Sequence, residues 1–146
     1  MSITIVGASA ADLPAILDLR RRNALPPDGL EAHLATTLAA RDGARLVGCA
    51  ALELHGASAL LRSVAVDSAH RGQGLGRRLT HHACDLGRAR GVRAVYLLTT
   101  TAGDFFPKLG FRAITRAEVD PAVRQSVEFT AACPADALVM RRDLAP

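Results

Sequence analysis

The residues best suited to chemistry are the glycines within residues 71–77, a segment that reads Arg-Gly-Gln-Gly-Leu-Gly-Arg. An apolar, strand-like run precedes this segment and an amphipathic, helix-like run follows it. Glycine lets the backbone approach a ligand closely, and the first N–H groups of a helix have no partner within the helix. With the positive end of the helix dipole, these groups form an anion site that suits a pyrophosphate. The segment therefore predicts a phosphate-binding loop, with Arg71 and Arg77 adding charge at its two ends.

Other phosphate-binding loops do not fit these residues. The sequence has no Gly-Lys-Ser/Thr triplet, which excludes the P-loop of nucleoside triphosphatases. A dinucleotide-binding pattern begins at Gly72 and Gly74, but Arg77 occupies the place of its third glycine, and residues 99–101 offer no acid for a ribose. A purely structural turn does not explain three glycines at the start of a helix, because each destabilises a helix by about 1 kcal/mol relative to alanine.

The elements around this loop follow from hydrophobic periodicity and turn residues. Pro and Gly at residues 26–29, Asp-Gly at residues 42–43 and His-Gly at residues 55–56 mark breaks. The order of elements predicts an α/β (α+β) sandwich around one mixed, mostly antiparallel sheet, in a single domain spanning residues 1–146. The pattern predicts strands at residues 3–7, 59–66, 92–99, 111–114 and 137–144, one bent hairpin or two strands within 45–54, and helices at residues 10–22, 30–40, 75–91 and 101–109.

Composition narrows the class of protein. The 146 residues suit one domain, and 49% hydrophobic content can fill its core. A net charge of +4 suits an anionic ligand, but a chain with no Trp, one Tyr and four Phe lacks side chains that stack on bases, which argues against a nucleic-acid partner. No run is long enough to cross a membrane and no signal peptide is evident, so we expect a cytoplasmic protein. Cys49, Cys84 and Cys133 are scattered, which predicts neither a metal site nor a disulfide framework.

Three segments in the expected order resemble the GNAT acetyltransferases. Arg71-x-x-Gly74-x-Gly76 is similar to the coenzyme A pyrophosphate motif of that family. Residues 61–66 resemble its fourth strand, and residues 102–111, which end Lys-Leu-Gly-Phe, resemble a later helix and its Gly-Phe step. The resemblance implies a GNAT fold with a sheet of about seven strands, splayed between strands 4 and 5 and flanked by about four helices.

The resemblance also implies the ligands and their contacts. Acetyl-coenzyme A would be the acyl donor, and a small amine would attack it directly in a ternary complex, in a monomer or a homodimer. A main-chain N–H near Val64 would polarise the acetyl carbonyl as an oxyanion hole. The residues implied to bind the cofactor are Val64, Ala65, Val66, Arg71, Gly72, Gln73, Gly74, Leu75, Gly76, Arg77, Thr100, Phe105, Phe106 and Lys108.

The sequence departs from the family where an acid is usual. Many relatives carry a Tyr that protonates the leaving thiolate, and Phe106 stands in that place. The only tyrosine, Tyr96, lies within a predicted strand and suits the core. Water, Ser63, Thr99, Thr100 or Cys133 remain open as the proton source. For the base, Glu53 is the preferred residue, acting through water, and a solvent-facing strand residue is its alternative. The sequence assigns no partner to His33 or His70, and His81 and His82 suit the surface.

The acceptor is implied by a narrower resemblance. Residues 97–106, 128–129 and 133–134 are similar to the small stand-alone acetyltransferases of bacterial arsenic-resistance operons, and more distantly to the acetyltransferase domain of N-acetylglutamate synthases. This implies an amino-acid-like acceptor, such as a glutamate analogue bearing arsenic. An acceptor carboxylate would need a cation, ideally an arginine. Arg62 is the first choice, followed by Arg20 and Arg124, and Glu128 would bind the ammonium. A solvated surface position is the alternative for each arginine.

Two further functions stay open at this point. A non-catalytic module that binds acyl-coenzyme A would fit the loss of the tyrosine at Phe106. An N-acetyltransferase for protein N-termini or lysines would fit the same cofactor loop.

Overall fold

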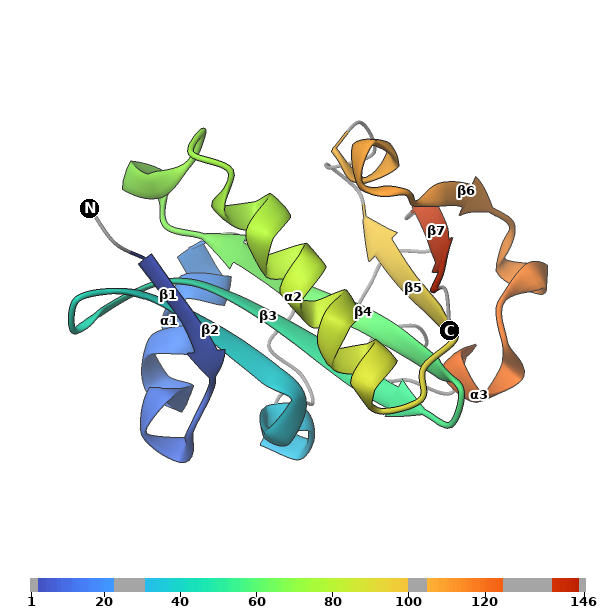
Figure 1. The fold of residues 1–146 in the computed structure, drawn as a ribbon, viewed down its shortest axis with the longest axis horizontal. Helices are drawn as coiled ribbons and strands as arrows, with labels where there is room; N and C mark the ends of the chain where they lie inside the picture. The colour runs from blue at the N-terminus through green and yellow to red at the C-terminus, as the bar shows by residue number, and fades with distance from the viewer. Residues whose placement is uncertain (1–2, 23–30, 100–104, 125–137, 145–146) are drawn as a thin grey trace.

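A single seven-stranded sheet organises the molecule, in the order β1-β2-β3-β4-β5-β7-β6 (Figure 1). The computed structural model describes residues 3–22, 31–99, 105–124 and 138–144. Among the strands in these residues, only β4 and β5 pair in parallel, and the other neighbours are antiparallel. This confirms the predicted mixed sheet of about seven strands. The strands are β1 (Ile3–Gly7), β2 (Thr37–Asp42), β3 (Arg45–His55), β4 (Ser58–Val66), β5 (Ala94–Thr99), β6 (Arg112–Ile114) and β7 (Leu138–Asp143).

Helices cover both faces of the sheet. In Figure 1, α2 (Leu75–Ala89) crosses in front of β3 and β4, and α1 (Leu13–Arg22) lies behind the sheet near β1 and β2. Alternation along β3 divides the core between them, because successive strand residues face opposite sides. Ala50 and Leu52 pack with the leucines of α2, whereas Cys49 and Ala51 pack with Ile16 and Leu19 of α1. A third helix, α3 (Pro121–Arg124), lies near the far end of β4.

A third apolar cluster surrounds Tyr96. The ring is 2% exposed among Leu60, Val119, Val123 and Val139, and the phenolic oxygen accepts a hydrogen bond from the Arg141 guanidinium at 2.8 Å. The predicted core role of this tyrosine is confirmed.

The helix expected at residues 30–40 is wrong. A short 3₁₀ helix, η2 (Glu31–Thr36), is followed at once by β2, which lies between β1 and β3 in the sheet. The hydroxyl of Thr36 donates to the carbonyls of His33 and Leu52, and the hydroxyl of Thr37 donates to His33 as well. Side-chain bonds of this kind offer the backbone an alternative to helix, and burial of β2 between its neighbours outweighs the helix propensity of its alanines. The described chain accordingly has three α-helices where about four were expected.

Two other boundaries differ from the sequence prediction. Residues 45–54 belong to one long strand, β3, and the chain reverses only at Gly56, which has a φ of 68°. The strand stays unbroken because it is paired on both sides, with β2 and β4. Of the helix expected at residues 101–109, the described part is the 3₁₀ helix η4 (Phe106–Leu109), closed by Gly110 in the left-handed conformation as expected.

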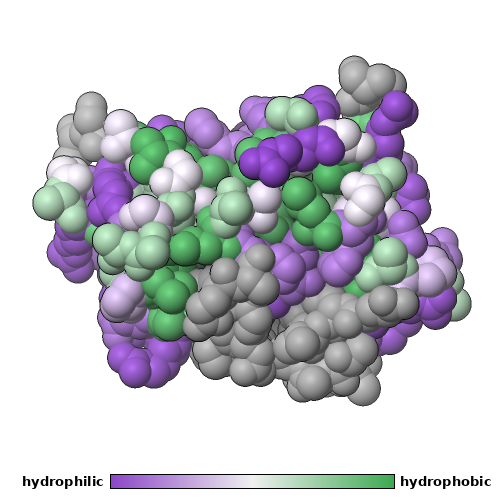
Figure 2. Space-filling view, turned by 90° about the horizontal axis from the view of Figure 1, so that it is seen from below, coloured by the Kyte–Doolittle hydropathy of each residue, from purple (hydrophilic) through white to green (hydrophobic). Residues whose placement is uncertain are grey.

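Within the described residues, no helix is long and apolar enough to span a membrane. On the face shown in Figure 2, hydrophobic and hydrophilic residues are interspersed. The large hydrophobic side chains that stay exposed in the described chain are Val6, Phe105 and Leu138.

Candidate active site

The glycine loop (residues 71–74) connects the end of β4 to the start of α2. A one-turn 3₁₀ helix, η3 (Ser68–His70), leads into an extended Arg71, and Gly72 and Gly74 then take φ values of 81° and 78°. Gly74 is the N-cap of α2. A Cβ built on either glycine would meet nothing within 4 Å, so the loop faces open space where a ligand can reach the backbone. Fifteen helical residues follow, whose first N–H groups and dipole favour an anion.

The two central strands separate next to this loop. β4 and β5 pair only through three residues, from Ser58 opposite Ala94 to Leu60 opposite Tyr96. Beyond Leu60, β4 stays paired with β3, and no described strand pairs with its other edge. The predicted splay between strands 4 and 5 is therefore confirmed. It leaves backbone N–H and C=O groups of β4 available to an added, extended ligand.

A β-bulge interrupts β4 within this splayed part. Cys49 faces Ala65 and Ala51 faces Arg62, so two residues of β4, Ser63 and Val64, lie opposite the single residue Ala50. A bulge leaves an extra residue out of the ladder and re-aims the groups beside it, and bulges are common next to active sites. The main-chain N–H predicted to polarise the acetyl carbonyl thus lies at an irregularity of the strand.

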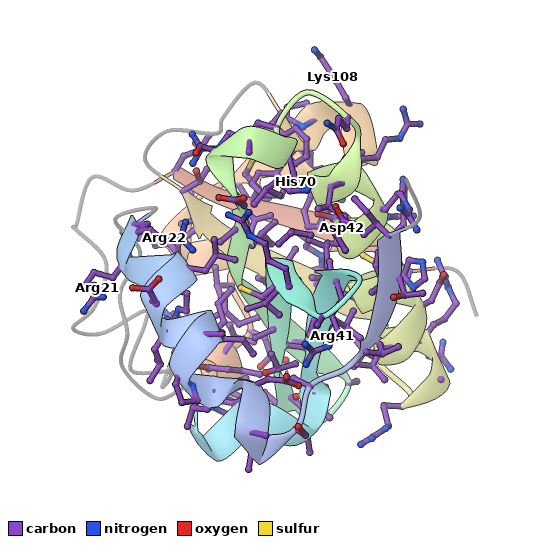
Figure 3. The ribbon with its side chains drawn as sticks, turned by 90° about the vertical axis from the view of Figure 1, so that its left-hand side faces the viewer. Arg21, Arg22, Arg41, Asp42, His70 and Lys108 are labelled. Atoms are coloured by element: carbon purple, nitrogen blue, oxygen red, sulfur yellow. The ribbon has the colours of Figure 1, made fainter. Side chains whose placement is uncertain are left out.

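The aromatic residues at residues 105–111 divide into two roles. Phe105 is half-exposed, and its ring lies 3.4 Å from the position that a Cβ on Gly76 would occupy, so it covers the first turn of α2. Phe106 is buried, with its ring edge-to-face against Phe105 and Phe111. A phenylalanine in the core donates no proton. Lys108 is exposed and points outward in Figure 3.

The opposite face of the sheet carries a buried ionic cluster, which we call the Glu53 cluster. One carboxylate oxygen of Glu53 accepts a hydrogen bond from the Arg62 guanidinium and lies 3.5 Å from Nε2 of His33. The other lies 3.2 Å from Nε2 of His55. Glu53 and Arg62 are each 2% exposed, which rules out the solvent-facing alternative for both. Burial lowers the pKa of His33, and the charges of Arg62 and His55 add to this against the opposing charge of Glu53.

The other predicted acceptor residues are placed differently. Arg20 of α1 is 1% exposed, so the surface alternative is wrong for this arginine too. Arg124 ends α3 and is exposed. Thr100, Glu128 and Cys133 lie outside the described residues. Ser63 belongs to β4 beside Val64.

Two members of the Glu53 cluster were missed as site residues. His55 follows Glu53 by two positions on one strand, and such residues share a face, so the spacing could have found it. His33 comes from η2, 20 positions earlier, and no local signal connects it to Glu53. Among the described residues, no group of three or more His, Cys, Asp or Glu side chains is placed to hold a metal ion.

Comparisons with known proteins agree with this geometry. A family model described as the acetyltransferase (GNAT) domain matches residues 33–113. The chain is 31% identical over 116 residues to glucosamine 6-phosphate N-acetyltransferase from Trypanosoma brucei brucei, with 74% of each chain covered.

Solved structures share the fold. N-acetylglutamate synthase from Neisseria gonorrhoeae, complexed with coenzyme A and N-acetylglutamate, superposes with a TM-score of 0.86 at 23% identity. The match covers 100% of this chain but 36% of the synthase, so the chain spans about a third of that protein. The ribosomal-protein-S18-alanine N-acetyltransferase from Escherichia coli superposes with a TM-score of 0.76 at 23% identity, over 99% of this chain and 96% of that one.

A splayed sheet with a glycine loop at the start of the central helix defines a class of acyltransferases that bind coenzyme A. The chain belongs to the GNAT acetyltransferase family. It is an N-acetyltransferase that uses acetyl-coenzyme A as acyl donor. The glycine loop fits the pyrophosphate of this cofactor, because open space and unpaired helix N–H groups meet there.

Proposed function

We propose that the acceptor is a small amine that also carries a carboxylate, an amino acid or amino-acid analogue. The observation that carries this proposal is the burial of Arg62 and Arg20 on the face opposite α2. A guanidinium is expensive to bury, and it is the side chain best shaped to hold a carboxylate with two parallel hydrogen bonds. Arg62 already donates to Glu53 from Nη1, but a guanidinium carries five N–H donors, so one arginine can hold two carboxylates. We therefore propose that Arg62, helped by Arg20, also holds the acceptor carboxylate, which favours an acidic small molecule over a long basic peptide.

The surroundings of Glu53 support a role in taking the proton that the acceptor ammonium must lose. Its carboxylate is fixed by Arg62 on one oxygen and by His55 on the other. His33, whose side chain is 26% exposed, lies between this carboxylate and solvent. Because burial lowers its pKa, His33 stays neutral at neutral pH and can receive a proton. We propose that Glu53 acts as the base through water and that His33 passes the proton onward.

We propose that acetyl-coenzyme A binds along the part of β4 that separates from β5. When bound, acetyl-coenzyme A supplies the acetyl group as a thioester. The N–H near Val64 would hold the acetyl oxygen, the glycine loop with Arg71 and Arg77 would hold the pyrophosphate, and Phe105 would cover the loop. With Phe106 in the core, solvent or Ser63 would return a proton to the thiolate.

The experiment follows release of free thiol from acetyl-coenzyme A with matched acceptors. Each amino acid, including glutamate and its arsenic and phosphorus analogues, is paired with the amine that lacks its carboxylate. We expect turnover of one small acid and a kcat/KM lower by about 100-fold for its partner amine, in line with one charged hydrogen-bonding pair. Equal turnover of both members of a pair would contradict the proposal, as would preference for peptides.

A variant keeps this test specific to the acceptor site. Arg62→Lys retains the charge opposite Glu53 but loses the planar fork. It should raise the KM for the acid by about tenfold and leave the affinity for coenzyme A unchanged. We further propose that residues 1–146 act as one catalytic domain, as a monomer or homodimer, which gel filtration with light scattering would decide.

A further inference from the structure

A second buried ionic cluster lies at the entrance to the glycine loop. His70, the last residue of η3, is 7% exposed. Its Nδ1 lies 3.2 Å from Oδ2 of Asp67, and its Nε2 lies 3.3 Å from Oδ2 of Asp42. Figure 3 shows His70 and Asp42 side by side, although they are 28 positions apart in the chain. The imidazole thus has a carboxylate at each of its two nitrogens.

This arrangement sets a condition on the protons of the ring. A carboxylate only accepts hydrogen bonds, and a neutral imidazole carries a single N–H. Both contacts are favourable together only when the ring holds its second proton and donates from both nitrogens. If that proton leaves, one carboxylate faces a lone pair and the link to β2 or to β4 is lost.

Other charged groups act on the same cluster and must be weighed. The carboxylate of Asp67 also accepts from Arg22 of α1 and Arg45 of β3, each at 3.2 Å. Burial raises the pKa of Asp67, but the hydrogen bond from His70 and the charges of Arg45 and Arg22 outweigh it and lower the pKa overall. Both arginines oppose a charge on the imidazole. They are, however, 48% and 67% exposed, so water screens them, whereas the His70 side chain is 9% exposed.

The position of His70 gives the cluster a consequence for the ligand. His70 directly precedes Arg71, and Asp67 directly follows β4, whose last backbone bond runs from the Asp67 N–H to the carbonyl of Val47. The glycines of the loop have no side chains that could hold its shape, and each has more conformational freedom to lose on binding than any other residue. The turn at residues 67–70 is therefore the part that can fix the loop.

We propose that protonated His70 is a positioning residue for the cofactor, because it ties Asp67 at the end of β4 to Asp42 at the end of β2 and so holds the glycine loop ready for the pyrophosphate of coenzyme A. The inference rests on the proposed assignment of residues 71–77 to that pyrophosphate. Its chemical consequence is that affinity for the cofactor falls as pH rises, since the clamp needs a proton.

The experiment measures the Kd of coenzyme A by calorimetry at about pH 6 and about pH 8.5, on either side of the range where histidine titrates. Four proteins are compared: wild type, His70→Gln, Asp42→Asn and the control His82→Gln, which alters an exposed histidine of α2. Titration of the ligand's own phosphates changes the Kd of all four proteins equally, so comparison with the control cancels that effect.

We expect His70→Gln to weaken binding about tenfold at the lower pH, which corresponds to about 1.4 kcal/mol, and less at the higher pH. Asp42→Asn should keep the wild-type affinity and lose its pH dependence. The new carboxamide can donate to an unprotonated Nε2, so this ring no longer needs two protons. This second variant decides the question even if His70→Gln folds poorly.

Affinity within twofold of the His82→Gln control at both pH values, for both His70→Gln and Asp42→Asn, would overturn the inference and leave His70 a purely structural residue. Gly74→Glu separates the two levels of the argument. If it also binds coenzyme A normally, the loop assignment itself is wrong. If Gly74→Glu does not bind while His70→Gln and Asp42→Asn bind with the affinity of the His82→Gln control at both pH values, only the role of His70 fails.

Discussion

Placing a carboxylate at the start of α2 should abolish cofactor binding and leave the fold intact. Gly74 is the N-cap of this helix, in open space, and a Glu there would place its charge where the pyrophosphate is proposed to lie. Two unit charges about 4 Å apart repel by about 4 kcal/mol at an effective dielectric constant of about 20. We therefore expect Gly74→Glu to raise the Kd of coenzyme A by about 10³-fold.

The backbone of Gly74 adds a separate cost that does not belong to binding. Its φ of 78° is a conformation that costs other residues about 1–2 kcal/mol, in the free and the bound protein alike. For a chain of this size, that strain lowers the melting temperature by about 4–8 °C. It cancels in the ratio of bound to free protein, so the loss of affinity reports the charge and bulk alone.

Gly91 offers a matched control at the other end of α2. It has a φ of 84°, and a Cβ there would also meet nothing within 4 Å. Gly91→Glu should melt at about the same temperature as Gly74→Glu while binding coenzyme A normally. Gly74→Gln separates bulk from charge, and about 1 M salt should restore part of the affinity of Gly74→Glu only, because screening then acts within about 3 Å. Normal binding by Gly74→Glu, measured by calorimetry, would refute the assignment of the loop.

Four further results are expected. Glu53→Gln should lower kcat by about 100-fold at an unchanged Kd for coenzyme A, as loss of a general base does, and an unchanged kcat would exclude that role. Replacing both members of the Glu53–Arg62 ion pair, as in Glu53→Leu with Arg62→Met, should abolish transfer and leave the melting temperature equal or higher. The reason is that a buried ion pair often stabilises a protein no more than an apolar pair of similar shape. A large drop in melting temperature would contradict this. Cys49 and Cys84 should resist iodoacetamide at about pH 8 until the protein is unfolded, because burial raises the pKa of both thiols. The pKa of Cys49 rises to about 12, so about one molecule in 10⁴ carries a thiolate there at this pH. Rapid labelling of either thiol in the native protein, followed by mass spectrometry, would be inconsistent with the packing. Gly48→Ala should lower the melting temperature by about 4–12 °C, since its Cβ would lie 3.0 Å from a leucine of α2 and overpacking costs about 1–3 kcal/mol; an unchanged melting curve would show that α2 can move aside.

Local rules account for what the sequence predicted well. The glycine loop and α2 follow from residues adjacent in the chain, where glycine placement and helical periodicity act directly. The helix expected at residues 30–40 failed because its fate is decided elsewhere. The Thr36 hydroxyl bonds to the carbonyl of Leu52, and β2 gains neighbours on both sides, neither of which a local pattern can report.

Part of the proposed acceptor site is implied by the sequence more directly than its local patterns suggest. The turn at Gly56 leaves two residues between β3 and β4, which fixes the register so that Glu53 faces Leu60. Arg62 is then the diagonal neighbour of Glu53 on the same face, within reach of a long side chain. The Glu53–Arg62 pair is thus implied by the hairpin alone. The partners of His33 and His70 are not, because each depends on a strand end or a 3₁₀ turn placed by tertiary packing.

The positions of the two buried ionic clusters connect stability to function. Burying charge is seldom the most stable choice, since an apolar replacement of the same shape does as well or better. Yet Glu53 with Arg62, and His70 with Asp67, bracket residues 63–66 of β4, the bulged and splayed stretch proposed to meet the cofactor. Packing alone gives no reason for charges to gather at both ends of this stretch. A catalyst does give one, because fixed charges and dipoles around a reacting group need no reorganisation when charge develops there. The cost in stability is therefore concentrated where transfer of an acetyl group would use it.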